Sequence, residues 1–138
     1  MLIICEYNNM EKEILHKNLS YKLNGIFYYI HNKLGRYCSH KQYADAMEIV
    51  FKEKRVDYKR EIDTPVEFSG ELVKGNIIDF LVDNTIPIDI KTEKYITKAD
   101  FMQMKRYLKA TNRKLGIIVN FRQRSLEPKR VINSSGKI

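Results

Sequence analysis

Two aspartates interrupt short apolar runs in the stretch "GNIIDFLVDNTIPIDIKTEK", which spans residues 75–94. If residues 83–85 form the turn of a β-hairpin, Asp79 lies directly opposite Asp89 and both side chains share one face. Cross-strand Cβ atoms lie about 5 Å apart, and two unit negative charges at about 5 Å repel by about 3 kcal/mol at an effective dielectric constant of about 20. A divalent cation reverses this repulsion, because Mg²⁺ prefers hard oxygen ligands.

Strand alternation places Lys91 on the same face as Asp89, with Ile88 and Ile90 on the opposite, buried face. The acids and the lysine form a candidate hydrolytic cluster. The carboxylates hold a metal, the metal lowers the pKa of a bound water, and the ammonium orients that water or stabilises charge developing on a phosphate. The alternative is a solvated hairpin face on which the lysine neutralises the acids. The inference depends on the three-residue turn, since a shift of one residue moves the acids out of opposition.

Periodicity and capping signals predict the elements that carry this hairpin. Apolar residues at helical spacing predict an amphipathic helix over 19–34. In "SHKQ", Ser39 and Gln42 offer a capping box for a second helix that ends near Lys54. We expect two strands within 56–82 with a turn at "FSGE", a third over 86–92, a helix capped by Thr97, a buried strand over 114–121 and a short strand in "KRVI". This order is typical of an α/β layer with a mixed sheet.

Length and composition bound the class of protein. The 138 residues, 43% apolar and 30% charged, predict one domain over 1–138, with its core at about 19–132 and a disordered tail at 133–138. The apolar runs are too short to span a membrane and no basic leader precedes the first, so we expect a soluble cytoplasmic protein without a membrane partner. Cys5 and Cys38 lack CxxC spacing, which argues against a zinc site, an iron–sulfur cluster or a disulfide framework.

The formal charge of +8 is concentrated in one segment. From Lys98 to Arg130 the chain has ten Lys or Arg against two acidic residues, so the remainder is balanced. This asymmetry predicts a basic surface for a polyanion, although a solvated lysine-rich face is the open alternative. The residues that we expect to contact phosphates, independently of base sequence, are Lys98, Lys105, Arg106, Lys109 and Arg113.

The spacing from Asp79 to "DIK", which is Asp89 to Lys91, resembles the PD-(D/E)xK nuclease superfamily. In "QMKRY", Gln103 and Tyr107 lie four residues apart on the following helix and resemble the QxxxY motif of the RecB-like branch. The chain from about 19 to 132 is also similar to the small bacterial and archaeal GxxExxY proteins of this superfamily. The matching segments are "LSYKLNGIFYYIHNKLG", Tyr43 with "ADAM", "IIDFLVDNTIPIDIKT", "QMKRYLKATNRKLGIIVNF" and "SLEPKRVI".

The resemblance implies a restriction-endonuclease-like core of order α-β-β-β-α-β, with a central mixed sheet flanked by helices. It also implies a metal-dependent nuclease that hydrolyses DNA by a metal-activated water. Mg²⁺, or Mn²⁺, would be held by Asp79, Asp89 and the backbone carbonyl of Ile90, with Lys91 positioning the water. Gln103 and Tyr107 would steady the site or the scissile strand.

This chain departs from the sequence signature that gives the GxxExxY family its name. Tyr37, His40 and Tyr43 stand at the positions of Gly, Glu and Tyr, and the tyrosine is the one match. His40 is a candidate metal ligand in place of the glutamate, since a neutral imidazole binds Mn²⁺ better than Mg²⁺. Its place at a helix start, near the positive end of the helix dipole, is expected to disfavour protonation.

Two other functions stay open at this stage. One is a catalytically inactive nucleic-acid-binding or accessory module of the same fold, and the other is a protein-interaction scaffold whose basic segment meets an acidic partner. Retention of the two aspartates, the lysine and the Gln/Tyr pair favours the nuclease. A homodimer is a further expectation, because two copies could cut two strands, but the sequence leaves open whether they assemble.

Overall fold

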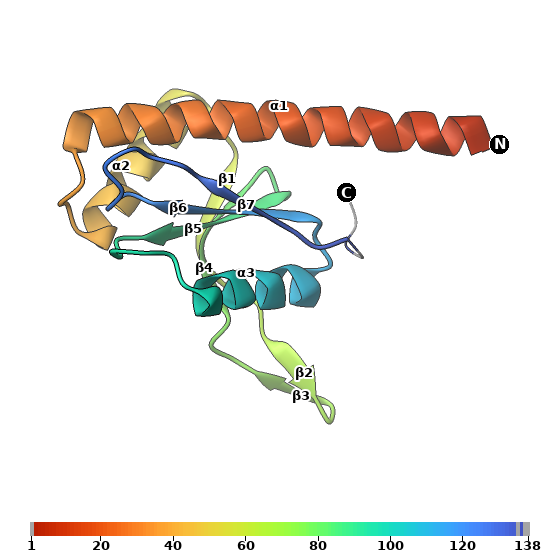
Figure 1. Cartoon of the computed structure of the whole chain (residues 1–138). Helices are drawn as coiled ribbons and strands as arrows, with labels where there is room; N and C mark the ends of the chain where they lie inside the picture. The colour runs from red at the N-terminus through yellow and green to blue at the C-terminus, as the bar shows by residue number, and fades with distance from the viewer. Residues whose placement is uncertain (1, 135, 137–138) are drawn as a thin grey trace.

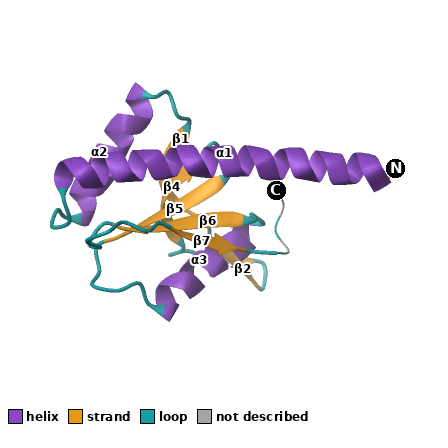
Figure 2. Ribbon diagram, turned by 45° about the horizontal axis from the view of Figure 1, so that its top comes forward, coloured by secondary structure: helices purple, strands orange, loops and turns teal. Residues whose placement is uncertain are grey.

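The computed structural model describes residues 2–134 and 136, with side chains from residue 16 onward. Two helices, α1 and α2, cover one face of a five-stranded sheet, and α3 covers the other (Figures 1 and 2). The helices are α1 (Leu2–Leu34), α2 (His40–Glu53) and α3 (Lys98–Thr111). The sheet contains, in spatial order, β1 (Tyr58–Asp63), β4 (Ile77–Val82), β5 (Ile86–Lys91), β6 (Leu115–Asn120) and β7 (Lys129–Ile132).

The sheet is mixed, as the sequence predicted. Strands β5 and β6 are parallel and the other neighbouring pairs are antiparallel. The parallel pair requires a crossover, which α3 supplies on one face of the sheet. The order of the core elements and their layers confirm an α/β fold of the restriction-endonuclease-like kind.

Both faces of the sheet bury apolar side chains. On the face of α1 and α2, Ile88 and Ile90 pack among residues that include Phe27, Phe51 and Phe80. On the face of α3, Ile78 and Ile118 pack with Met104 and Leu108. Since Ile88 and Ile90 face α1 and α2, the intervening Asp89 and the following Lys91 face α3. The predicted separation of polar and apolar faces along β5 is therefore confirmed.

The predicted hairpin register is confirmed by the strand pairing. Val82 pairs with Ile86 and Phe80 with Ile88. Asp83 and Asn84 in the turn have φ of 53° and 51°, in the left-handed region that Asp and Asn tolerate better than most residues. The three-residue turn therefore sets the predicted register up to Phe80 and Ile88, where the ladder ends, and Asp79 and Asp89 follow directly beyond this last pair.

The helix caps and the last two strands also agree with the sequence. Gln42 N–H donates to Ser39 Oγ at 3.2 Å and Ser39 N–H donates to Gln42 Oε1 at 2.8 Å, which completes the capping box. Thr97 caps α3 in the same way with Asp100. All six residues of β6 are buried, and "KRVI" forms β7.

The first helix is longer than predicted. Its 33 residues begin at Leu2 rather than near Leu19, and at 1.5 Å per residue it measures about 50 Å. In Figure 1 its N-terminal part continues beyond the sheet. Apolar periodicity marks the part of a helix that packs on a core, so it located the segment over the sheet and missed the extension, which no Gly or Pro interrupts.

Residues 56–82 form four strands, so the expectation of two strands was wrong. The additional pair, β2 (Val66–Phe68) and β3 (Glu71–Val73), makes a separate hairpin that projects past α3 (Figure 1). Its turn is the predicted "FSGE", with Ser69 and Gly70 both at positive φ. The hairpin has no buried face, since all six strand residues are exposed. Without burial there is no alternation to reveal the strands.

Some expectations fall at the chain ends. Residues 135, 137 and 138 of the predicted disordered tail, and the side chain of Cys5, lie outside the described residues. Within the tail, Gly136 N–H donates to the Asn133 carbonyl at 3.0 Å. Across the described chain, no helix combines the length and apolar character that a membrane span requires.

Candidate active site

The two predicted carboxylates meet where β4 and β5 separate. The last paired residues of this ladder are Phe80 and Ile88. Beyond them, Asp79 Oδ2 accepts the Ile90 N–H at 2.6 Å, so a side-chain oxygen takes the place of a strand carbonyl. The carboxyl groups of Asp79 and Asp89 interact closely enough to shift each other's pKa in opposite directions. Two neighbouring carboxylates repel each other, so a proton kept by one of them stabilises the pair.

The environments of the two acids drive their pKa values apart. Burial raises the pKa of Asp89 to about 7, the hydrogen bond to Asp79 and its charge act in the same direction, and Lys91 opposes them. Burial also acts to raise the pKa of Asp79, but hydrogen bonds from His40, Asp89 and the Ile90 N–H outweigh it and leave that pKa below its ordinary value. Asp89, which is 6% exposed, therefore keeps a proton to higher pH than Asp79 does.

Lys91 links this pair to α3. Its ammonium donates to Gln103 Oε1 at 3.1 Å and lies 3.2 Å from Asp89 Oδ2 and 3.6 Å from Asp100 Oδ1. Burial acts to lower the pKa of Lys91, but the nearby carboxylates, Asp89 first among them, raise it above its ordinary value. The lysine is therefore positively charged at neutral pH, and Gln103 fixes the direction of its ammonium.

A second acid pair, which the sequence analysis missed, lies on the other side of Lys91. The carboxyl groups of Glu93 and Asp100 interact closely, and the interaction with Asp100 is the main cause of the raised pKa of Glu93. For Asp100, burial acts to raise the pKa, but the hydrogen bonds from Glu93 and the Thr97 backbone lower it. The capping signal of Thr97 locates Asp100 in the first turn of α3. Its contact with Lys91 depends on how α3 packs against β5.

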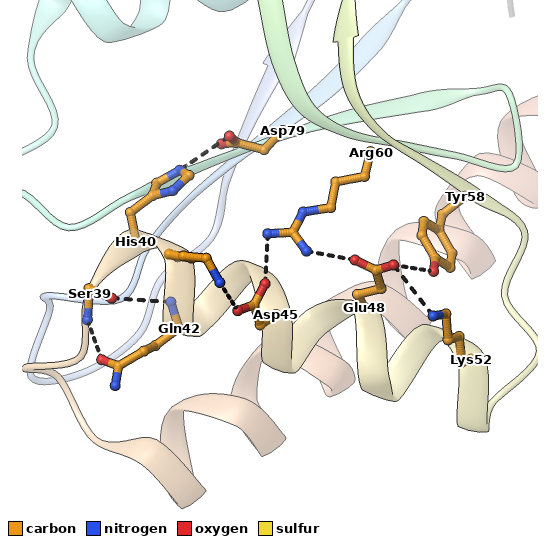
Figure 3. A network of polar contacts seen from close by, with 10 residues as sticks. Ser39, His40, Gln42, Asp45, Glu48, Lys52, Tyr58, Arg60 and Asp79 are labelled. Carbon is orange, nitrogen blue, oxygen red and sulfur yellow. Dashed lines mark hydrogen bonds and ion pairs between the residues drawn. The ribbon is translucent and has the colours of Figure 1, made fainter.

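His40 reaches the site from the first position of α2 (Figure 3). Its Nε2 lies 3.2 Å from Asp79 Oδ1, and this hydrogen bond raises the pKa of His40 while burial opposes the shift. The expectation that the helix dipole keeps the ring unprotonated was wrong. A carboxylate in hydrogen-bond contact has a larger effect on the imidazole than the partial charge of a helix end.

An ion-pair network holds the helix that carries His40 (Figure 3). Arg60 on β1 donates to Glu48 at 2.6 Å and forms an ion pair with Asp45 at 2.9 Å. Tyr58 donates to Glu48 at 3.0 Å. Because Asp45 and Glu48 lie on α2, these contacts fix α2 against β1 and thereby the position of the imidazole.

The two residues of the predicted QxxxY motif separate in the structure. Gln103 contacts Lys91, whereas Tyr107 is 1% exposed within the apolar cluster under α3. Four residues advance a helix by about 6 Å, which moves Tyr107 along the sheet and away from the acids. Burial raises the pKa of Tyr107, with Arg113 and Thr64 acting in the opposite direction. Among residues 16–134 and 136, its hydroxyl has no hydrogen-bond partner of good geometry.

Four of the five predicted phosphate-contacting residues project from α3 into solvent. Lys98, Lys105, Arg106 and Lys109 are all exposed, and the three lysines share one helix face at positions i, i+7 and i+11. The fifth, Arg113, donates to the Asn84 side chain at 3.0 Å and to its backbone carbonyl, so it joins the end of α3 to the hairpin turn.

Tyr43, the one match to the family signature, holds a loop. It is fully buried and its ring stacks on Phe121 with a centroid separation of 4.3 Å. Its hydroxyl donates to the Gly35 carbonyl and accepts the Cys38 N–H. These contacts fix the chain between α1 and α2, directly before His40. The spacing from Tyr43 to His40 marked the position, but the sequence did not indicate this role.

Asn120 ties the loop after β5 to the end of β6, and sequence reasoning missed it. It is fully buried. Its Oδ1 accepts the backbone N–H groups of Glu93 and Arg122, and its Nδ2 donates to the Glu93 carbonyl at 2.8 Å. A polar residue at the end of an otherwise apolar strand is the one signal in the sequence that could have identified it.

The donor chemistry of the pair fits a divalent cation. Asp79 and Asp89 offer hard oxygen ligands, and Asp89 Oδ2 is buried without a hydrogen bond of good geometry among the described residues. Within that same part of the chain, no three His, Cys, Asp or Glu side chains are arranged to hold a metal. A cation here would therefore complete its coordination with backbone carbonyls and water, as Mg²⁺ does in many proteins.

Comparison with known proteins agrees with this geometry. The model of a family described as the PD-(D/E)XK nuclease superfamily matches residues 17–131. The chain belongs to this superfamily. Membership suggests a nuclease function and hence a nucleic-acid substrate, and proteins of the PD-(D/E)XK superfamily generally use divalent metals.

A solved structure supports the fold. The protein described by the words "Crystal structure of SSO0001" matches with a TM-score of 0.51 and 21% sequence identity. The match covers 65% of this chain and 48% of that chain, so this superfamily member corresponds to about half of the other protein. No curated protein matches the sequence.

Proposed function

We propose that this domain is a metal-dependent nuclease that hydrolyses phosphodiester bonds in DNA. The observation that carries the proposal is the pair of half-buried Asp79 and buried Asp89 with the charged Lys91 ammonium 3.2 Å from Asp89, in the order that the superfamily motif requires. Two acids beside one ammonium suit a reaction in which a water attacks a phosphate and negative charge develops on its oxygens.

The proposed cofactor is Mg²⁺, with Mn²⁺ as a substitute. Asp79, Asp89 and the Ile90 carbonyl would hold the ion, with His40 in its neutral form as a fourth ligand. A bound divalent cation supplies Lewis-acid stabilisation of the phosphate and lowers the pKa of an attacking water.

The protein's own side chains supply the remaining functions. Lys91, kept protonated by its neighbouring carboxylates, stabilises negative charge on the phosphate or orients the water. Gln103 positions Lys91 through its 3.1 Å contact, and Tyr107 supports the helix that carries Gln103 from the core. The exposed basic side chains of α3 contact phosphates and do not recognise nucleobases. These residues are Lys98, Lys105, Arg106 and Lys109.

A second candidate function is a nucleic-acid-binding module without catalysis. The observation that favours it is that each acid already has a protein partner. His40 Nε2 lies 3.2 Å from Asp79 Oδ1 and the Lys91 ammonium lies 3.2 Å from Asp89 Oδ2, so the carboxylates are paired without any bound cation. In this case the site is a structural ion cluster and the basic face of α3 carries the function.

A metal titration combined with a cleavage assay distinguishes the two functions. Calorimetry with Mn²⁺ and cleavage of single-stranded, duplex and branched DNA are measured for the wild type, Asp89→Asn and the control Asp57→Asn, which alters an exposed aspartate. The nuclease predicts saturable Mn²⁺ binding and cleavage in the wild type and the control, both lost in Asp89→Asn. Salt-sensitive DNA binding that is indifferent to EDTA and to Asp89→Asn, with no cleavage, supports the binding module instead.

We further propose that the domain belongs to the GxxExxY family of the RecB-like branch. The segments that match, including the QxxxY spacing, support this placement, while His40 is its main departure. A homodimer and a cytoplasmic location remain predictions of the sequence. Analytical ultracentrifugation with and without DNA tests the first, and a fluorescent fusion of the whole protein tests the second.

A further inference from the structure

An exposed tyrosine lies close to two arginines beside the candidate active site. Tyr37, on the loop between α1 and α2, is 73% exposed. The guanidinium carbons of Arg36 and Arg122 lie 5.2 and 5.0 Å from the centre of its ring. Arg36 comes from the same loop, whereas Arg122 follows β6, so the cluster forms through the tertiary fold.

The cluster is held rigidly although its ring is exposed. The Tyr43 hydroxyl bonds to the residues on both sides of the Arg36–Tyr37 dipeptide, Gly35 and Cys38. Arg36 Nε donates to the Arg122 carbonyl at 2.9 Å, which ties the loop to the chain after β6. A ring presented in a fixed position loses little conformational entropy when a ligand binds to it.

The two positive charges of the cluster favour binding of an anion. Among the described residues, neither Arg36 nor Arg122 forms an ion pair with a carboxylate, and the two guanidinium groups repel each other. The ring, largely open to solvent, contributes little burial to the fold. A ligand that combines a flat apolar group with a negative charge complements both features, and a nucleotide is such a ligand.

The cluster adjoins the catalytic residues along two chain segments. Tyr37 precedes His40 by three residues, and His40 contacts Asp79. Arg122 follows Phe121, whose N–H donates to the Lys91 carbonyl at 3.0 Å. A polynucleotide chain that passes the acids and Lys91 therefore meets the ring and the guanidinium groups within a short distance.

We propose that Tyr37, Arg36 and Arg122 form a subsite that stacks one unpaired base of single-stranded nucleic acid and binds its adjacent phosphate. In a duplex the faces of the bases are covered by their neighbours, so the subsite selects single strands or frayed ends. The identity of the ligand as a nucleic acid rests on the proposed function. Stacking on an aromatic ring is tolerant of base sequence, so the subsite selects strand state rather than sequence.

Fluorescence anisotropy in EDTA, which excludes cleavage, tests the subsite with a labelled single-stranded oligonucleotide and its duplex. We expect Tyr37→Leu to weaken single-strand binding by about 5- to 150-fold, the range for losing one base–aromatic stack, and Tyr37→Phe to stay within about twofold of the wild type. Arg122→Gln should reduce the slope of log K against log salt by about 0.7 for the single strand. Duplex binding should respond little to Tyr37→Leu.

Tyr21→Leu is the matched control, because this tyrosine on α1 is 82% exposed and lies on a different part of the chain. Equal single-strand binding by the wild type and Tyr37→Leu overturns the inference, as does an equal loss in the Tyr21→Leu control or on the duplex. If the wild type does not cleave DNA but Tyr37→Leu weakens single-strand binding, the nuclease proposal is refuted and the subsite is supported. If the wild type cleaves DNA and Tyr37→Leu binds single strands as tightly as the wild type, the nuclease is supported and the subsite is refuted.

Discussion

Replacing Asp89 with asparagine should stabilise the metal-free protein at alkaline pH and leave it nearly unchanged at acid pH. The amide of Asn resembles the protonated carboxyl group in shape and can still donate a hydrogen bond to Asp79. Below about pH 4, where Asp89 is protonated in both the native and the unfolded wild type, the two proteins are therefore equivalent. At a pH where Asp89 must ionise, the wild type contains a buried, crowded carboxylate and the variant does not.

The size of this effect follows from the pKa of Asp89. An aspartate ionises near 3.8 in the unfolded chain and near 7 in the native site. Between these values the native state holds one more proton than the unfolded state, so stability falls as pH rises, and above about pH 7 the fall ends. With about 1.4 kcal/mol for each pKa unit, the wild type should lose about 3 kcal/mol relative to Asp89→Asn between pH 5 and pH 8.

Neighbouring groups do not confuse this comparison. Asp79 has a lowered pKa, so its contribution is lost only as pH falls below the window of interest. His40 has a raised pKa, so its contribution is lost as pH rises above about 6.5; the hydrogen bond to Asp79, which is the main cause, remains in both proteins, and only the smaller effect of the Asp89 charge is removed in the variant. The difference between the proteins therefore reports Asp89.

Urea unfolding followed by far-UV circular dichroism, in EDTA at pH 5 and pH 8, measures the difference. The exposed Asp57→Asn serves as the control and should follow the wild type at both pH values. Millimolar Mn²⁺ at pH 8 should then stabilise the wild type and not Asp89→Asn, since an ion that binds only the native state shifts the unfolding equilibrium. A difference between the wild type and Asp89→Asn that is the same at pH 5 and pH 8 would refute the reasoning.

Two further predictions concern the residues that hold the loops around the site. Asn120→Ala removes three hydrogen bonds to the backbone of Glu93 and Arg122, so urea unfolding should show a loss of about 2–4 kcal/mol; an unchanged midpoint would contradict the role assigned to Asn120. Tyr43→Phe keeps the stack on Phe121 but removes the bonds to Gly35 and Cys38, and should cost about 1–3 kcal/mol. The same variant should weaken single-strand binding in the anisotropy assay because the Tyr37 loop is released, and unaltered binding would show that the loop is held by other contacts.

The elements that the sequence predicted best are those whose signals are local. The "DNT" turn sets the β4–β5 register, Ser39 and Thr97 cap their helices, and the apolar composition of β6 marks a strand buried on both faces. Each of these depends on residues within a few positions of one another, so the sequence contains the whole cause. The β2–β3 hairpin and the extension of α1 were missed because neither packs on the core in a way that imposes an apolar pattern.

The candidate active site likewise has features that the sequence predicted and features that it did not. The proximity of Asp79 and Asp89 just beyond the last ladder pair, and the shared face of Asp89 and Lys91, follow from the hairpin register and strand periodicity, which the sequence alone predicted. The raised pKa values of Asp89 and His40 depend on burial and on contacts between β4, β5 and α2. Those quantities arise from groups that are distant in sequence, so no local pattern encodes them.

For this protein the sequence by itself determined which residues could do chemistry, and the tertiary structure decided their charge states and their companions. Packing α3 on β5 brought Asp100 and Gln103 to Lys91, and packing the end of β6 against the α1–α2 loop brought Arg122 to Tyr37. Strand periodicity acts over a few residues, whereas desolvation and electrostatic interactions depend on distance in space. Strand periodicity can therefore be predicted from the amino-acid sequence, whereas the charge states and contacts of the site are defined only when the chain has folded.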